Sequence, residues 1–347
     1  MTLIEEPPYA PRRPAELLAE LEGLTAHHLA GCAEFARCWP DWRPQGTLAA
    51  LPFLHVGLFK RLRLVTQGPQ LEHQRTLLSS ATTGATPSMI VLDRHSSALQ
   101  ARSSAAILRD FLGPEPRPLL VLDSARALLR RGEITARTAA AMSLKPLASA
   151  IHFVLGDGED PRSLDWAKVA EVAEGAKGLL VYGFTSMLWR AWGSVEPPEG
   201  LRRLLRGKAI HFVHSGGWKR LEAERVTRER FDTALLAGAG AGSSVVDYYG
   251  LVEQVGIIYP QCEQGLRHVP LWAEVLVRDP HTQAPLATEA GQLQLLNVLS
   301  WGAPCHSVLT EDLGQLVPGE CPCGRHGPRF RLLGRLPKAE LRGCAHV

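Results

Sequence analysis

Short apolar runs alternate with amphipathic segments through the middle of the chain. The strand-sized apolar runs cover residues 89–92, 119–122, 151–155, 179–184 and 210–213. Between them, apolar residues recur at helical spacing, which predicts helices over residues 96–111, 125–131 with 136–144, 164–174 and 185–192. Because strands joined by helices run parallel and are buried on both faces, this alternation predicts an α/β fold with a mostly parallel sheet.

The pattern differs on either side of this region. Leucines at helical spacing predict a helix over residues 14–38. After Gly250, residues 272–278 and 292–298 alternate between apolar and polar side chains around a turn-rich loop, and residues 330–333 form a further short strand, which is typical of an antiparallel unit.

We expect four parts, of which the two on either side of residue 250 form lobes of one body rather than independent domains. They are an N-terminal helical region (1–76), an α/β core with a phosphate loop (77–250), a β-rich subdomain (251–333) and a tail (334–347).

Composition and charge exclude several classes of function. The net charge is +3, from 38 Lys and Arg against 35 Asp and Glu, and no basic cluster suggests a nucleic-acid partner. The chain has no signal-peptide core, and no apolar stretch approaches the roughly 18 residues of a membrane span, so we expect a cytoplasmic protein without a membrane partner. Seven cysteines, an odd number, argue against a disulfide framework.

Cysteines gather in the last quarter of the chain and indicate a metal site there. Cys321 and Cys323 form a C-x-C knuckle, and Cys262 and His268 lie upstream of it. Three thiolates and one imidazole suit a closed tetrahedral Zn²⁺ site of structural type. The Cys305-His306 pair and His326 are alternative ligands, and unliganded buried thiols are the alternative to a metal.

Residues 79–88 gather hydroxyl side chains around a single glycine just before the first predicted strand. The run contains Ser80, Thr82, Thr83 and Gly84. Such a loop can offer hydroxyls and backbone N–H groups to a polyanion. A Ser/Thr-rich surface turn is the alternative.

Three further motifs follow in order along the chain. Tyr249-Gly250 precedes Glu253, and an aromatic face suits a planar base while a carboxylate suits Mg²⁺. Asp312 lies in a Thr-Glu-Asp-Leu-Gly segment, and Arg335 follows Gly334. Taken singly, these are a tyrosine-rich strand end, a common turn and a common dipeptide.

Together, the four motifs resemble those of the adenylate-forming enzymes, which include acyl-CoA ligases, peptide-synthetase adenylation domains and luciferases. The resemblance implies that residues of the 79–88 loop hold the phosphates of ATP and that Tyr249 stacks on adenine. It also implies that Glu253 holds Mg²⁺, that Asp312 accepts both ribose hydroxyls and that Arg335 lies near the ribose and phosphate.

The chain departs from the superfamily pattern at three positions. Ala81 replaces a glycine, Ser88 stands where a lysine is usual, and Val252 replaces a threonine. Ser88 matters most, because the missing lysine removes a positive charge from the triphosphate.

Other segments resemble one branch, the LuxE-like acyl-protein synthetases of bacterial bioluminescence. Residues 214–219 resemble its G-G-W-K signature, which assigns Gly216 and Gly217 to the nucleotide site, and residues 340–344 resemble its E-L-R-G-C ending. The likeness covers nearly the whole chain from about residue 50. It implies the N-terminal-domain fold of the superfamily, with mostly parallel sheets and a smaller antiparallel β unit, and with the C-terminal lobe absent.

The resemblance also implies an acyl-carrying thiol. In this branch the terminal cysteine takes the acyl group as a thioester, a role that falls to Cys344. Lys338 is a candidate for the catalytic lysine that the missing lobe would supply, and Lys219 or a partner subunit are alternatives.

The predicted function is that of an acid–thiol ligase. With ATP and Mg²⁺ it activates a carboxylic acid, fatty or aryl, to acyl-AMP and passes the acyl group to Cys344 and then to a partner such as an acyl reductase. One alternative makes coenzyme A or a carrier protein the acceptor, with Cys344 a bystander. Another is a weakly catalytic subunit that binds nucleotide or acyl-adenylate and regulates a partner.

Overall fold

Six strands form a mostly parallel sheet in the computed structural model, which describes residues 2–79, 86–126 and 133–336. In spatial order they are β10 (Tyr259–Pro260), β9 (Ser244–Tyr249), β8 (Ala209–Ser215), β7 (Gly178–Phe184), β4 (Arg117–Val121) and β6 (Ala148–Phe153). The edge pair β10–β9 is antiparallel and the other described pairs are parallel. β7 and β8 are buried almost throughout, which explains their continuous apolar sequences.

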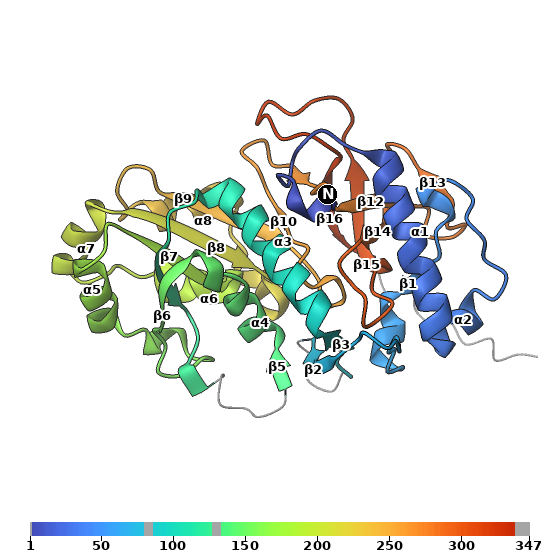
Figure 1. The fold of residues 1–347 in the computed structure, drawn as a ribbon. Coiled ribbons are helices and arrows are strands. Elements are labelled where there is room, and N and C mark those ends of the chain that lie inside the picture. Colours follow the sequence, from blue (N-terminus) through green and yellow to red (C-terminus); the bar gives the residue numbers. More distant parts are fainter. Residues whose placement is uncertain (1, 80–85, 127–132, 337–347) are drawn as a thin grey trace, which may run out of the picture.

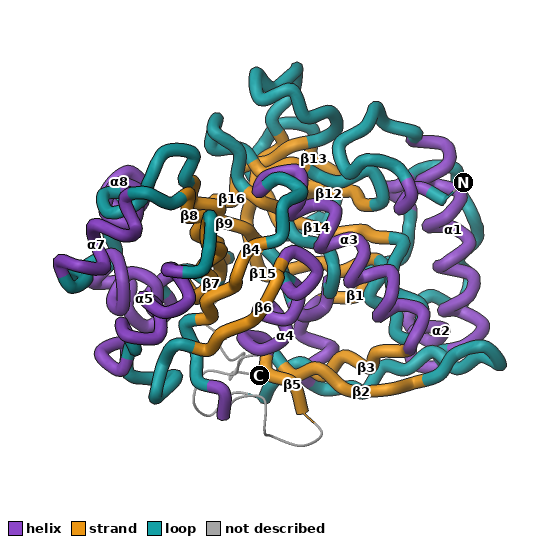
Figure 2. The backbone as a smooth tube through the Cα atoms, turned by 60° about the vertical axis from the view of Figure 1, so that its left-hand side comes forward, coloured by secondary structure: helices purple, strands orange, loops and turns teal. Residues whose placement is uncertain are grey.

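Helices cover both faces of this sheet, as Figures 1 and 2 show. One face carries α3 (Arg94–Leu112) and α4 (Ala136–Ser143), and the other carries α5 (Trp166–Glu174), α7 (Glu199–Arg206) and α8 (Arg228–Leu236). A short helix, α6 (Thr185–Leu188), follows β7 and continues as a π-helical turn (Trp189–Gly193). The two-sided burial confirms the predicted α/β class.

The predicted strand 89–92 is real, but it lies outside the parallel sheet. It is β3 (Met89–Asp93), which pairs antiparallel with β2 (His73–Leu78), and β2 pairs parallel with β5 (Glu133–Thr135). β2 begins with polar residues, so the apolar pattern did not reveal it. The hairpin brings Ser79 and Ser88 together, because the Ser79 N–H donates to the Ser88 carbonyl at 3.0 Å.

The C-terminal part forms a second large sheet, on the right in Figure 1. Its order is β11 (Arg267–His268), β16 (Arg329–Arg335), β15 (Ser307–Leu316), β14 (Gly291–Asn297), β12 (Ala273–Arg278) and β13 (Pro285–Leu286), and β1 (Leu54–His55) pairs with β15. Apart from β1, these strands pair antiparallel. The segment around Asp312 is part of β15 rather than a turn.

The N-terminal helices lie against this second sheet, although the two are at opposite ends of the chain (Figure 1). They are α1 (Pro14–Gly31) and α2 (Ala33–Cys38), so the helix predicted over residues 14–38 is interrupted at Cys32, where the backbone is extended. From α1, Thr25 lies 3.0 Å from His306 Nε2 and His28 bonds the Ser300 carbonyl at 2.9 Å. None of the helices in the described part of the chain has the length and apolarity to cross a bilayer.

Candidate active site and metal centre

The candidate active site lies on the seam between the two large sheets, and we define the seam as Tyr249, Glu253, Asp312 and Arg335. Tyr249 ends β9 at the carboxyl edge of the parallel sheet, where α/β proteins bind ligands. Its hydroxyl donates to Asp312 Oδ2 at 2.8 Å, from one sheet to the other. Arg335 is paired with Asp312 in the β15–β16 register, and its Nε lies 3.4 Å from Asp312 Oδ1. Three separate sequence motifs therefore meet in space.

Burial controls the protonation of the Tyr249–Asp312 pair. The Tyr249 ring stacks on Tyr259, with 6.0 Å between ring centroids. Burial, and then the charge of Asp312, raises the pKa of Tyr249 well above its ordinary value, so the hydroxyl stays a donor. Burial also raises the pKa of Asp312, which the Tyr249 hydroxyl and Arg335 oppose.

Glu253 is a buried carboxylate just beyond β9. It lies in the 3-10 turn η9 (Val252–Gln254) and is 4% exposed. Burial raises the pKa of Glu253, while the Ser88 hydroxyl and then the charge of Lys60 act against this shift. Lys60 ends η3 (Val56–Lys60), which packs against β3 and β15. A buried carboxylate whose charge is incompletely compensated fits a cation such as Mg²⁺.

A small pocket adjoins Glu253 and is lined by β3, α3 and the loop before β15. The neighbouring Gln254 fixes the turn, because its Nε2 donates to the Cys305 carbonyl at 2.6 Å and its Oε1 accepts from Asn297 Nδ2 at 2.9 Å. This buried amide network ties the turn that carries Glu253 to β14 and to the loop before β15.

The described ends of the predicted phosphate loop, Ser79 and Ser88, lie near Glu253. Ser88 is buried, and its N–H donates to Ser79 Oγ at 2.8 Å. β3, which follows directly, lines the same pocket as Glu253. Six of the predicted site residues lie outside the described part of the chain, namely Ser80, Thr82, Thr83, Gly84, Lys338 and Cys344.

Gly216 and Gly217 follow β8 at the same carboxyl edge. Their φ angles of 83° and 59° are in the left-handed region, which glycine adopts without steric cost. The pair therefore lets the chain turn sharply where β8 ends. Gly250 directly follows β9 and is exposed.

A polar cluster beside these glycines was not found from the sequence. His214 Nδ1 lies 3.0 Å from Thr185 Oγ1 and 3.8 Å from Asp247 Oδ1, and Arg267 donates to Asp247 Oδ2 at 2.6 Å. Burial lowers the pKa of His214 to about 4, so its ring is neutral at pH 7. Thr185, His214 and Asp247 lie at the carboxyl ends of three neighbouring strands, and that position was the available signal.

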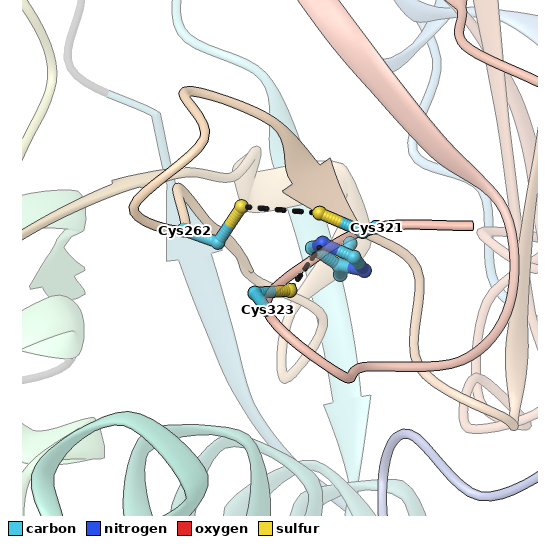
Figure 3. A group of neighbouring side chains, drawn as sticks. Cys262, Cys321 and Cys323 are labelled. Atoms are coloured by element: carbon cyan, nitrogen blue, oxygen red, sulfur yellow. Dashed lines mark hydrogen bonds between the residues drawn. The ribbon is translucent and has the colours of Figure 1, made fainter. Parts of the chain in front are cut away.

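Four side chains converge on a candidate metal centre, and three of them are labelled in Figure 3. The possible ligand atoms of Cys262, His268, Cys321 and Cys323 lie within 4.8 Å of one another. The Cys262 and Cys321 sulfurs are 3.9 Å apart, and Cys323 Sγ is 3.2 Å from His268 Nε2. A tetrahedral Zn²⁺ with Zn–S distances of about 2.3 Å separates its ligands by about 3.5–3.8 Å, so this donor set fits zinc.

The metal centre and the polar cluster are joined by one short strand. β11 consists of Arg267 and His268 alone. His268 faces the cysteines, whereas Arg267 bonds the side chain of Asp247 and the carbonyl of Tyr259 at 2.9 Å. This two-residue strand therefore supplies a candidate metal ligand, His268, and fixes the end of β9 through Arg267.

The fold is that of the adenylate-forming enzymes. A structure of 2-hydroxyisobutyryl-CoA ligase with its acyl-adenylate and coenzyme A superimposes with a TM-score of 0.66 at 15% identity, over 94% of this chain and 76% of that one. A second structure of that ligase, in the postadenylation state, matches with a TM-score of 0.66 at 16% identity, over 95% and 69% of the two chains.

Within this class, the chain belongs to the family described as acyl-protein synthetase, LuxE, whose profile matches residues 38–347. The long-chain-fatty-acid–luciferin-component ligase of Aliivibrio fischeri is 26% identical over 142 residues. That segment spans 40% of this chain and 37% of the length of the ligase.

Proposed function

We propose that the protein uses ATP to activate a carboxylic acid and passes the acyl group to a thiol. The carboxylate attacks the α-phosphorus of ATP, the bond to the bridging oxygen of the β-phosphate breaks, and acyl-AMP and pyrophosphate result. The thiolate of Cys344 then attacks the acyl carbon and displaces AMP, which leaves a thioester. A partner such as an acyl reductase takes the acyl group onward.

One observation carries the first step: Tyr249, Asp312 and Arg335 come from separate motifs and are in contact at the seam. In this proposal adenine stacks on the face of Tyr249 and the ribose binds to Asp312. Glu253 would hold the Mg²⁺ that accompanies ATP, and that ion would neutralise phosphate charge. Membership of the family and the fold class support the same reaction.

Lys60 compensates for the lysine that Ser88 replaces. Its charge acts on the buried Glu253, and it lies on η3, which packs against β3 directly after the phosphate loop. Its ammonium group would supply positive charge to the phosphates bound beside Glu253. We therefore assign Lys60 to the triphosphate.

A structural Zn²⁺ completes the proposal. Cys262, His268, Cys321 and Cys323 would hold it, and it would stabilise the loop between β15 and β16 against β11. No chemical step passes through this metal.

ATP–pyrophosphate exchange with a panel of fatty and aromatic acids tests the activation step. We expect exchange with one class of acid, and exchange with none would contradict that step.

Label from that acid should remain on the protein, and Cys344→Ser should lose the label while keeping exchange. A label that persists in Cys344→Ser, or a thioester formed only with added coenzyme A, would exclude Cys344 as the acceptor. ATP binding without exchange would indicate a binding subunit.

A further inference from the structure

We infer that Arg267 is a positioning residue for the nucleotide site and that it couples the binding of ATP to the binding of metal by the four-ligand centre. Arg267 has this role only if adenine stacks on Tyr249, so the inference rests on the proposed function. Arg267 itself would contact neither ATP nor the metal. It acts through the strands on either side of it.

A short hairpin runs from the seam to the metal centre. It consists of β10 and β11, and Cys262 lies in the turn between them. The turn is tight, because the Cys262 N–H donates to the Leu266 carbonyl at 2.9 Å and the Gly265 N–H donates to the Cys262 carbonyl at 2.9 Å. Cys262 and His268 are two of the four possible metal ligands. A bound metal would therefore fix both arms of the hairpin.

The other end of the hairpin supports the ring of Tyr249. Tyr259 of β10 is paired with Tyr249 of β9, and the two rings stack with 6.0 Å between their centroids. Phe330, which is paired with Arg267 in the β11–β16 register, has its ring centroid 5.3 Å from that of Tyr259. Both Tyr259 and Phe330 are fully buried. Movement of the hairpin would therefore disturb the ring on which adenine stacks.

Arg267 connects the hairpin to β9 through its guanidinium group. This group donates to Asp247 Oδ2 at 2.6 Å, to the Tyr259 carbonyl at 2.9 Å and to the Asp247 carbonyl at 3.3 Å. The Arg267 side chain is 8% exposed, so water competes little for these bonds. A planar guanidinium reaches both strands at once, which the single ammonium group of a lysine does not reproduce.

Coupling between the two sites follows from this arrangement. Metal bound by Cys262 and His268 would restrict the hairpin, and Arg267 would pass the restriction to the end of β9. A nucleotide that binds beside an already ordered Tyr249 loses less conformational entropy on binding. Because linkage is reciprocal, ATP should raise the affinity for the metal by the same factor by which the metal raises the affinity for ATP.

Arg329 offers a matched control. It is about as buried as Arg267 and is paired with His268 in the β11–β16 register. Its guanidinium donates to the carbonyl of Pro318, in the loop between β15 and β16, at 2.7 Å. Arg329→Met therefore removes a buried guanidinium beside the metal centre and leaves the bonds between the hairpin and β9 in place.

Equilibrium competition for zinc with a soluble chelator, with and without saturating ATP, tests the inference. Mg²⁺ is kept in excess so that ATP does not itself bind the zinc. In the unmodified protein, ATP should raise the zinc affinity roughly tenfold. In Arg267→Met, ATP should no longer change the zinc affinity, whereas Arg329→Met should keep the effect of ATP. Pyrophosphate exchange should show a KM for ATP that is about tenfold higher in Arg267→Met, with a smaller change in kcat.

Arg267→Lys guards against loss of folding in the methionine variant. Arg267→Met leaves the Asp247 carboxylate without this ion-pair partner, whereas the lysine keeps a positive charge there. Because one ammonium group cannot replace all the bonds of the guanidinium, Arg267→Lys should show an effect of ATP of about threefold.

Three outcomes would overturn the inference. One is a zinc affinity of the unmodified protein that is the same with and without ATP, which needs no variant to fold. Another is the full effect of ATP in every folded Arg267 variant, which would make Arg267 a support of the fold alone. The third is a protein that binds ATP but holds no zinc. A protein that holds zinc but binds no ATP would instead contradict the proposed function, so the two failures are distinguishable.

Discussion

The metal centre and the seam are built from similarly distant parts of the chain, but they differ in what completes them. Cys262 and Cys321 are 59 residues apart, and Tyr249 and Asp312 are 63 apart. At the metal centre the possible ligand atoms of all four side chains converge on one point, where a single ion would complete the site. At the seam, Glu253 and Asp312 are buried carboxylates whose pKa values are raised by burial.

This difference assigns the two regions different roles. As proposed, a closed set of four ligands would hold the fold together, because binding a metal would contribute free energy to the folded state. Buried carboxylates instead cost free energy until a ligand neutralises them, which is typical of functional sites. We therefore expect changes at the metal centre to lower stability, and changes at the seam to lower activity with little loss of stability.

The largest effect should follow loss of a metal ligand. Cys321→Ser should abolish stoichiometric zinc and lower the free energy of unfolding by at least about 4 kcal/mol, because the remaining ligands no longer close the site. Metal analysis combined with urea unfolding would measure both quantities. Cys38→Ser is the control, since Cys38 is exposed and lies outside the cluster. A metal-free protein of normal stability would show that the thiols pack without a metal.

The next largest effect should come from Glu253→Gln. The amide keeps the shape of the side chain but loses the charge that would hold Mg²⁺, so exchange activity should fall roughly a hundredfold. Because burial raises the pKa of Glu253, its ionised form is destabilising at neutral pH, and the variant should be as stable as the parent or more stable. A large drop in stability with activity retained would reverse the roles assigned to the two regions.

The four side chains of the candidate metal centre could be selected from the sequence. Cysteine and histidine have few roles when they cluster, and the knuckle at Cys321 and Cys323 limits the geometry to a narrow range. Cys262 and His268 were preferred over Cys305, His306 and His326 as their partners, and the structure brings the preferred pair beside the knuckle. Sequence identifies such a site because residue chemistry alone limits the choice.

The arrangement of the seam could be predicted only in part. The motif resemblance singled out Tyr249 and Asp312, but their contact depends on the β15–β16 register and on how two sheets pack, which a local pattern does not specify. β15 itself was not predicted, because its sequence mixes polar and apolar residues that are buried alike. The cluster of Thr185, His214 and Asp247 was missed for a related reason. Its members are unremarkable singly and meet only because three strands are neighbours.

Mild acid should lower the free energy of unfolding of the protein by an intermediate amount. Burial lowers the pKa of His306 from 6.5 to about 3, so the folded state binds fewer protons than the unfolded state between these values. Stability is therefore full above pH 6.5 and falls as the pH is lowered, by about 2 kcal/mol from His306 alone between pH 7 and pH 5. Urea unfolding at both pH values should show a smaller loss for His306→Gln than for the parent.

The exposed His281 provides the control for this experiment. His281→Gln should keep the full loss of stability between pH 7 and pH 5. Equal losses in the parent and in His306→Gln would mean that His306 does not hold its neutral form against protonation in the folded protein.

The smallest effect should come from Lys60, and it separates binding of the triphosphate from support of the fold. Lys60→Met keeps most of the aliphatic length and removes the charge, so the KM for ATP should rise about fivefold to tenfold while kcat changes less. The charge of Lys60 also favours ionised Glu253, so its loss should raise the pKa of Glu253 further and shift the acid limb of the activity profile to higher pH.

Lys177→Met, at an exposed position directly before β7 and far along the chain from the seam, should leave both KM and the pH profile unchanged. An unchanged KM in Lys60→Met would place the compensating charge elsewhere, and an unchanged acid limb would mean that Lys60 and Glu253 do not interact in the working enzyme.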